Sequence, residues 1–143
     1  MFVGTSQRKL DDKGRIALPA ALRDELQGLG YVTVADDNVS IFTEDAFREF
    51  KDELEREVKD RGGVPRVVLR KLFAATQRLR ADSQGRVTLP AELLDAAGIG
   101  SGAGTEVVVN GANDRIEIWA PSTWAQLSDQ GNDALKDYMR GDS

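Results

Sequence analysis

The sequence contains neither cysteine nor histidine. Disulfide bonds, thiolate nucleophiles, imidazole bases and zinc sites made of these residues are therefore excluded. Aromatic residues make up only 6% of the chain, and there is no run of about 18 apolar residues that could form a transmembrane helix. Residues 1–8 lack the basic-then-apolar order of a signal peptide. We expect a cytoplasmic globular protein with no cofactor and no metal site, and an enzyme is the least favoured class.

Charge is distributed unevenly along the 143 residues. The net charge of −5 argues weakly against nonspecific binding to a polyanion. Residues 64–90, however, carry six basic residues against Asp82 alone, a local net charge of +5. Because nucleic acids respond to the field of one face of a protein, this block could bind them. It could equally solvate a helix, and charge alone leaves both interpretations open.

The chain contains an internal repeat. Residues 10–22 have the sequence L-D-D-K-G-R-I-A-L-P-A-A-L, and residues 81–93 have A-D-S-Q-G-R-V-T-L-P-A-E-L, an offset of 71 positions. Residues 39–42 then match 116–119 at an offset of 77, which implies an insertion in the Gly-rich stretch 98–104. We infer a duplication in which each half runs strand, turn, strand, short helix, strand, strand, helix.

Local patterns place the elements of each half. Alternation of apolar and polar residues predicts the strands, whereas proline, glycine and 3–4 spacing predict the helices and their ends. We expect Thr43 to cap a helix that ends near Asp60 at Arg61-Gly62-Gly63, and Ser122 to cap a short last helix. The expected strands are 6–10, 15–18, 31–35, 39–43, 76–81, 86–89, 106–109 and 115–119, and the expected helices are 20–26, 43–60, 64–73, 91–97 and 124–127.

The repeated turn has the pattern D-x-K/Q-G-R and admits three interpretations. An Asp–Arg ion pair across the turn could simply fix a hairpin, although exposed ion pairs stabilise proteins little. Alternatively, a two-stranded ribbon can enter the DNA major groove, where arginine binds O6 and N7 of guanine. On that interpretation Lys13 and Arg8-Lys9 could contact phosphates.

The third interpretation is enzymatic. Asp11 and Asp12 could serve as acid and base, but neighbours on an extended chain point to opposite faces. The glycines at 98–104 are not followed by the Lys-Ser/Thr pair of a phosphate-binding loop. We rank DNA binding first, a structural role second and catalysis last.

At these positions the sequence resembles the MraZ family of bacterial transcriptional regulators, within the wider AbrB/MazE-like group. The resemblance covers residues 1–127. The tail after Leu127 has no clear counterpart, and Ala81 stands where the first copy has Leu10. Four motifs in order carry the resemblance: M-F-V-G at 1–4, L-D-D-K-G-R at 10–15, D-S-Q-G-R-V-T-L-P at 82–90, and R-I-E-I-W at 115–119 after Gly111–Asp114.

The resemblance implies an α+β, β-rich fold: a duplicated, swapped-hairpin, double-split β-barrel with short helices. Residues 1–63 would form the first SpoVT/AbrB-like repeat with its helix, and residues 76–127 the second. The two would interlock into one domain. Residues 64–75 would be a basic linker helix, and residues 128–143 a polar tail that is mobile or marginally helical.

The resemblance further implies a sequence-specific, nucleoid-associated regulator. It would bind short direct repeats in double-stranded promoter DNA, upstream of its own division and cell-wall operon, as a ring-like homo-oligomer. An oligomeric scaffold of the same fold without DNA specificity is the alternative, and an antitoxin-like module is a further rival. By position, the implied DNA-binding residues are Arg15 and Arg86, with Lys13, Arg8, Lys9 and Gln84 as auxiliaries, and Asp11, Gly14, Asp82 and Gly85 would shape the turns.

Overall fold

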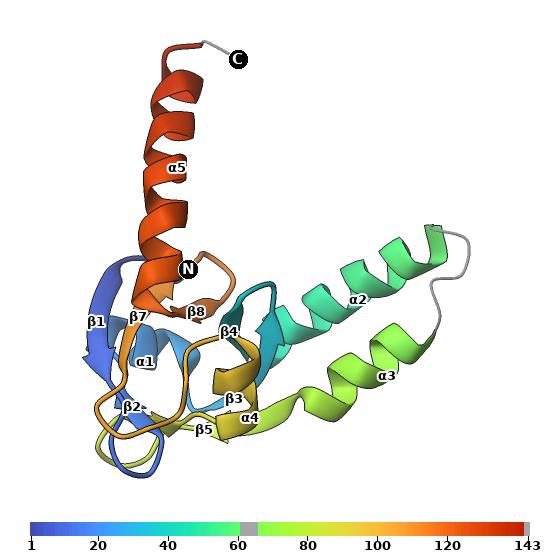
Figure 1. Ribbon diagram of the computed structural model, residues 1–143. Coiled ribbons are helices and arrows are strands. Elements are labelled where there is room, and N and C mark those ends of the chain that lie inside the picture. Colours follow the sequence, from blue (N-terminus) through green and yellow to red (C-terminus); the bar gives the residue numbers. More distant parts are fainter. Residues whose placement is uncertain (61–65, 142–143) are drawn as a thin grey trace.

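The computed structural model describes residues 1–60 and 66–141 (Figure 1). It is an α+β protein with antiparallel sheets. The strands are β1 (Thr5–Lys9), β2 (Arg15–Ala17), β3 (Leu29–Ala35), β4 (Asn38–Thr43), β5 (Gln77–Arg80), β6 (Arg86–Thr88), β7 (Glu106–Gly111) and β8 (Ile116–Trp119), and the helices are α1 (Ala20–Leu26), α2 (Glu44–Asp60), α3 (Arg66–Ala75), α4 (Ala91–Ala96) and α5 (Pro121–Met139).

Strands from both repeats share each sheet. The larger sheet has six strands in the order β1-β7-β8-β4-β3-β5, and the smaller sheet pairs β2 with β6. Each Asp–Gly turn could have closed a hairpin, but the strands on either side of a turn do not pair with each other. β1 pairs with β7, and β2 pairs with β6. Each repeat therefore completes its sheets with strands of the other.

The pairing register reveals a pseudo-twofold axis. If the repeats are exchanged, β1 becomes β5, β7 becomes β3 and β8 becomes β4, so the order of the six strands is unchanged. At the centre of the sheet Val39 is paired with Ile118 and Ile41 with Ile116, and an offset of 77 maps one pair onto the other. The duplication seen in the sequence is thus a spatial symmetry of the fold.

The core lies between the two sheets and the short helices. The strands alternate as half-buried strands should, with Ile16 of β2 and Val87 of β6 facing inward and almost completely buried. Val107, Val109 and Ile118 fill the middle of the larger sheet. Because an apolar side chain gains about 1.5–3 kcal/mol on full burial, these inward positions hold the short ribbon β2–β6 against the body.

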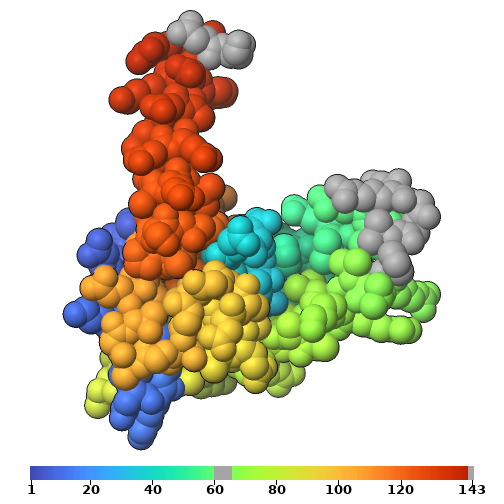
Figure 2. Space-filling model, viewed as in Figure 1, coloured from blue at the N-terminus to red at the C-terminus, as the bar shows by residue number. Residues whose placement is uncertain are grey.

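The helices α2 and α3 lie side by side and extend together away from the sheets (Figures 1 and 2). Thr43 caps α2 as expected, since its hydroxyl accepts a hydrogen bond of 3.2 Å from the backbone N–H of Ala46. Phe47 and Phe50 pack this helix on Phe42 of β4. The expected helix end at Arg61-Gly62-Gly63, and Val64 at the start of the linker helix, lie outside the described residues.

The C-terminal helix differs from the expectation. We predicted a short helix at 124–127 capped by Ser122 and, beyond it, a polar tail that is mobile or marginally helical, whereas α5 is one continuous helix from Pro121 to Met139. The residue at its N-cap is Ala120, without a side-chain cap, and Pro121 occupies the first turn, where no intrahelical donor is lost. The helix projects from the body, and none of its residues is buried (Figure 1). Among the described residues, no helix has the length and apolar character needed to span a membrane.

Candidate nucleic-acid interface

The two repeated turns meet at the β2–β6 ribbon. Arg15 pairs with Thr88, and Ala17 pairs with Arg86. Residues opposite each other in a sheet share a face, and side chains alternate between the two faces along a strand. Arg15 and Arg86 therefore both lie on the outer face of the ribbon. They are diagonal neighbours, with Cα atoms about 7–8 Å apart. Val87 between them points into the core. The alternation of the two strands thus brings one arginine from each repeat to a single outward surface.

Further backbone hydrogen bonds tie each turn to the other repeat. The N–H of Leu89 donates to the carbonyl of Gly14 over 2.8 Å, and the N–H of Leu18 donates to the carbonyl of Gly85 over 3.1 Å. These two bonds are equivalent under the offset of 71. The turns are therefore held by the ribbon on both sides, and neither can move independently of it.

In the first turn, Asp11 organises the backbone and positions Arg15. Its Oδ1 accepts hydrogen bonds from the backbone N–H of Lys13 at 2.9 Å and of Arg15 at 2.8 Å, and its Oδ2 accepts one from Arg15 Nε at 2.7 Å. Gly14 has a φ of 72°, a left-handed conformation that costs glycine little. One carboxylate therefore closes the turn and orients the guanidinium.

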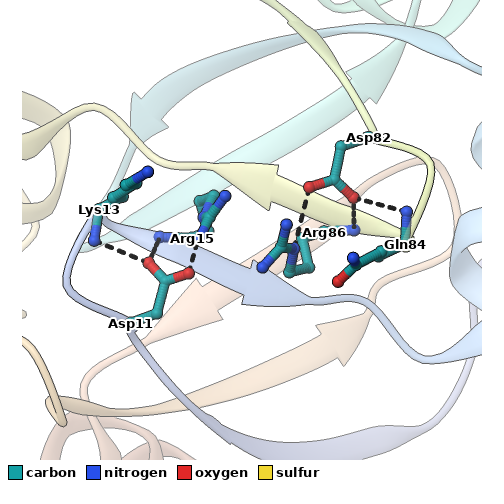
Figure 3. Close-up of polar contacts among 6 residues, drawn as sticks. All are labelled: Asp11, Lys13, Arg15, Asp82, Gln84 and Arg86. Atoms are coloured by element: carbon teal, nitrogen blue, oxygen red, sulfur yellow. Dashed lines mark hydrogen bonds and ion pairs between the residues drawn. The ribbon is translucent and has the colours of Figure 1, made fainter.

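The second turn repeats this geometry (Figure 3). Asp82 Oδ1 accepts from the backbone N–H of Gln84 and of Arg86, both at 2.9 Å, and Oδ2 accepts from Arg86 Nε at 2.9 Å. Gly85 has a φ of 76°. Figure 3 shows the two clusters side by side along the ribbon, one turn at each end.

The hydrogen bonds stabilise the charged form of both carboxylates. The backbone N–H of Arg15 is the largest cause of the lowered pKa of Asp11, which falls from 3.8 to about 2. The backbone N–H of Arg86 likewise lowers the pKa of Asp82. Both ion pairs therefore persist at neutral pH and offset the repulsion between the neighbouring guanidinium groups.

The pairing leaves most of each guanidinium available. Arginine has five N–H donors, and the Nε–H is the one bonded to the aspartate. The terminal nitrogens of Arg15 and Arg86 donate no hydrogen bond within the part of the chain that the structure describes. The side chains are partly exposed, 23% for Arg15 and 29% for Arg86, and each is oriented by the hydrogen bond from its Nε–H to the aspartate. A guanidinium that is partly exposed and oriented by a carboxylate can donate paired hydrogen bonds to a planar or anionic acceptor.

The auxiliary residues differ in availability. Lys13 is exposed at the tip of the first turn, and Lys9 is exposed at the end of β1. Arg8 instead donates its Nε–H to the carbonyl of Ala17 over 3.0 Å and an Nη1–H to the carbonyl of Gln7 over 2.9 Å. Arg8 thus braces β1 against β2, and it has fewer donors left for a phosphate. Gln84, exposed at the tip of the second turn, carries no charge where its counterpart Lys13 has one.

One basic residue beside the second turn was not anticipated from the sequence. Arg23 of α1 packs directly against Gly85, and its side chain is 41% exposed. No motif pointed to it, because it belongs to the first repeat and touches a turn of the second.

Among the described residues, no group of three or more Asp and Glu side chains could hold a metal ion.

The fold and the site define a class: an internally duplicated α+β protein in which each repeat contributes one Asp–Arg turn to a shared two-stranded ribbon. A family model described as "MraZ protein, putative antitoxin-like" matches residues 1–62 and 72–138. The chain therefore belongs to the MraZ family of transcriptional regulators. The family identified by the four motifs is confirmed, and so is the expectation that the protein is not an enzyme.

The relatives match along almost the whole chain, and each is named transcriptional regulator MraZ. The relative from Salinispora arenicola is 34% identical, covering 99% of this chain and 96% of its own length. The one from Mycobacterium ulcerans is 36% identical, covering 99% of both. The one from Clavibacter michiganensis is 35% identical, covering 96% of this chain and 93% of its own. The expectation that residues after Leu127 lack a family counterpart is wrong, since the family match extends to residue 138.

Proposed function

We propose that this chain is a sequence-specific DNA-binding transcriptional regulator that contacts bases through Arg15 and Arg86. The observation that carries the proposal is the β2–β6 ribbon, which presents both arginines on one outer face, each oriented by its own aspartate. A two-stranded ribbon fits the major groove of B-DNA, and a guanidinium can donate two hydrogen bonds to O6 and N7 of guanine. The names of the relatives support the assignment to regulation.

Two exposed lysines, one at the end of β1 and one in the first turn, would position the ribbon on the DNA backbone. They are Lys9 and Lys13, which precede Arg15 in the chain. Contacts to phosphates fix the register without carrying sequence information, and they make binding dependent on salt. The acidic helix α2, in which Glu and Asp outnumber Lys and Arg, would face away from the DNA or contact another subunit.

We propose further that the two sheets form the swapped-hairpin, double-split β-barrel of the AbrB/MazE/MraZ-like group, with both repeats interlocked in one domain. The exchange of strands between repeats supports this assignment. In the cell the protein would act in the cytoplasm, at the nucleoid. It would bind short direct repeats upstream of its own division and cell-wall operon as a ring-like homo-oligomer, because a ring is the closure of a head-to-tail interface.

The experiment is binding of the purified protein to its own upstream DNA, followed by fluorescence anisotropy at several salt concentrations. We expect selective binding that excess nonspecific DNA does not abolish. Replacement of Arg15 with alanine removes one base contact, so it should weaken specific binding by about 5- to 150-fold. Arg86→Ala should also weaken binding, because the two arginines are equivalent under the pseudo-twofold axis.

Arg48→Gln is the matched control, because this arginine is exposed on α2 and pairs with Glu44, far along the chain from either turn. It should bind DNA as the wild type does. Circular dichroism and size-exclusion chromatography should show that Arg15→Ala keeps its fold and oligomeric state. A stable oligomer without DNA preference would refute the proposal in favour of a scaffold.

A further inference from the structure

The two turns differ in charge although their backbones are equivalent. In the first turn Lys13 adds a positive charge beside Arg15. In the second turn Gln84 occupies the corresponding position and adds none. If the two turns contact DNA equally, the second turn lacks one cation for a phosphate.

Arg23 lies where it could provide that charge. It belongs to α1, and its side chain crosses the face of Gly85 in the second turn. A β-carbon placed on Gly85 would lie 2.8 Å from Arg23 Cδ and 3.2 Å from Cζ, too close for either atom to stay in place. The absence of a side chain at position 85 therefore makes room for the guanidinium next to Gln84 and Arg86.

The guanidinium of Arg23 is weakly committed within the protein. Its closest acidic partner in the described chain is Asp24, whose Oδ1 is 3.8 Å from Nε. That distance is too long for a hydrogen bond. The Asp24 side chain is 79% exposed, so water can solvate the carboxylate when Arg23 turns to another acceptor.

This contact breaks the pseudo-twofold symmetry. The counterpart of Arg23 in the second repeat is Leu94, which is completely buried. At Gly14, the counterpart of Gly85, the site of a β-carbon lies 3.3 Å from the carbonyl oxygen of Leu89, and no described side chain beyond its two chain neighbours lies within 4 Å of it. A cation from another element of the fold therefore packs on the glycine at the second turn, whose tip is neutral, and not at the first.

We propose that Arg23 binds a DNA phosphate at the second turn and replaces there the charge that Lys13 supplies at the first. Each turn then presents two cations, Lys13 with Arg15 and Arg23 with Arg86. Arginine suits this role because its planar fork can donate two hydrogen bonds to one phosphate. The inference rests on the proposed DNA binding and adds a residue to the same site.

The test measures the salt dependence of binding to the protein's own upstream DNA for wild type, Arg23→Met and Arg23→Lys. Methionine keeps an apolar stem over Gly85 and removes the charge, whereas lysine keeps the charge. Loss of one phosphate contact should reduce the steepness of the log–log salt dependence by about 0.9. Arg23→Met should show this change and weaken specific and nonspecific binding alike, and Arg23→Lys should retain the wild-type steepness.

A second variant pair tests the exchange of charge directly. Gln84→Lys introduced into Arg23→Met should restore the wild-type salt dependence, because it rebuilds in the second turn the charge pattern of the first. Arg48→Gln again serves as the control for removing a surface arginine elsewhere. Thermal unfolding of each variant establishes that the ribbon remains folded.

The outcomes separate this inference from the proposed function. A wild type that does not bind its upstream DNA selectively refutes both. The inference alone is overturned if Arg15→Ala weakens selective binding but Arg23→Met leaves both its strength and its salt dependence unchanged. A weakening by Arg23→Met that Gln84→Lys does not reverse also overturns it, because Arg23 would then act by packing and not by charge.

Discussion

Replacement of Gly111 with alanine should release the N-terminal segment from the larger sheet. Gly111 ends β7 beneath this segment, and a β-carbon there would lie 2.5 Å from the carbonyl carbon of Phe2 and 2.6 Å from that of Val3. These are backbone atoms, so no rotamer change relieves the overlap. The segment is held by Phe2, only 3% exposed, by two hydrogen bonds of 2.8 Å between Phe2 and Asn113, and by one of 2.8 Å from Gly111 to Gly4.

The expected loss follows from these contacts. Exposure of a phenylalanine side chain costs about 1.5–3 kcal/mol, and each lost backbone hydrogen bond costs about 0.5–1.5 kcal/mol. We expect Gly111→Ala to lower the free energy of unfolding by about 3 kcal/mol or more. For a chain of this size, about 2–4 °C of melting temperature is lost per kcal/mol, which thermal denaturation resolves readily.

A double-mutant cycle with Phe2→Ala tests the mechanism. Because both substitutions act on the same contact, the double variant should lose little more stability than the worse single variant. Gly131→Ala is the control, because Gly131 lies inside α5 with no atom within 4 Å of a β-carbon, and alanine there should stabilise the helix by up to about 1 kcal/mol. Fully additive losses, or a Gly111→Ala variant as stable as the wild type, would refute the reasoning.

Three further predictions concern the turns and the core. The folded-state pKa of Asp11 is about 2, below the ordinary 3.8. The hydrogen bonds to its carboxylate are therefore fully present above about pH 4 and are lost as the pH falls through about 2. The NMR shifts of the Lys13 and Arg15 amide protons should titrate with a midpoint near pH 2, and a midpoint at or above 3.8 would contradict the geometry. Thr33→Val removes a buried hydroxyl that has no hydrogen-bond partner among the described residues and should raise the free energy of unfolding by about 1 kcal/mol in urea titrations; a loss of stability would mean that the hydroxyl is satisfied. Ile16→Ala should lower the free energy of unfolding by about 2–5 kcal/mol, because Ile16 is 1% exposed. Arg15→Ala, at the neighbouring position on the outer face, should melt near the wild-type temperature. Equal losses of stability in the two variants would mean that both faces of β2 are structural.

Local elements were predictable because their signals are short in range. The helix expected at 20–26 coincides with α1, and the hairpin expected between 31–35 and 39–43 is formed by β3 and β4. Proline before α1 restricts φ, whereas glycine permits the positive φ that other residues rarely adopt. Both effects act at single positions, so the sequence reveals them without knowledge of the fold. The two Asp–Arg turns were found in the same way, since the hydrogen bonds that each aspartate carboxylate accepts lie within five residues of chain.

Strand partners were not predictable from these patterns. Alternation shows which face of a strand is buried, but it does not show which strand lies beside it. β2 and β6 are separated by about 70 residues of chain, and their pairing depends on the closure of the whole core. The same limit explains why Arg23 was missed, because its contact with Gly85 exists only after the two repeats have interlocked.

The length of α5 could not be inferred for a different reason. Its residues after Leu127 show little helical periodicity, with Gly131 in the middle and no buried side chain to mark an inner face. A helical segment without a buried side chain carries little amphipathic signal, and intrinsic propensity alone is a weak guide. The family match to residue 138 shows that the segment nevertheless belongs to the shared sequence.

The pseudo-twofold axis within one chain has a genetic consequence. In a dimer of identical chains every substitution appears twice, so the two halves of a binding surface must change together. In this chain a change in a single codon alters one half alone. The halves already differ at two pairs of equivalent positions, with Lys13 in place of Gln84 and Arg23 in place of Leu94. If the turns bind DNA as proposed, one turn can acquire a new base preference while the other maintains binding, and the two halves of the DNA site that they contact need not change together.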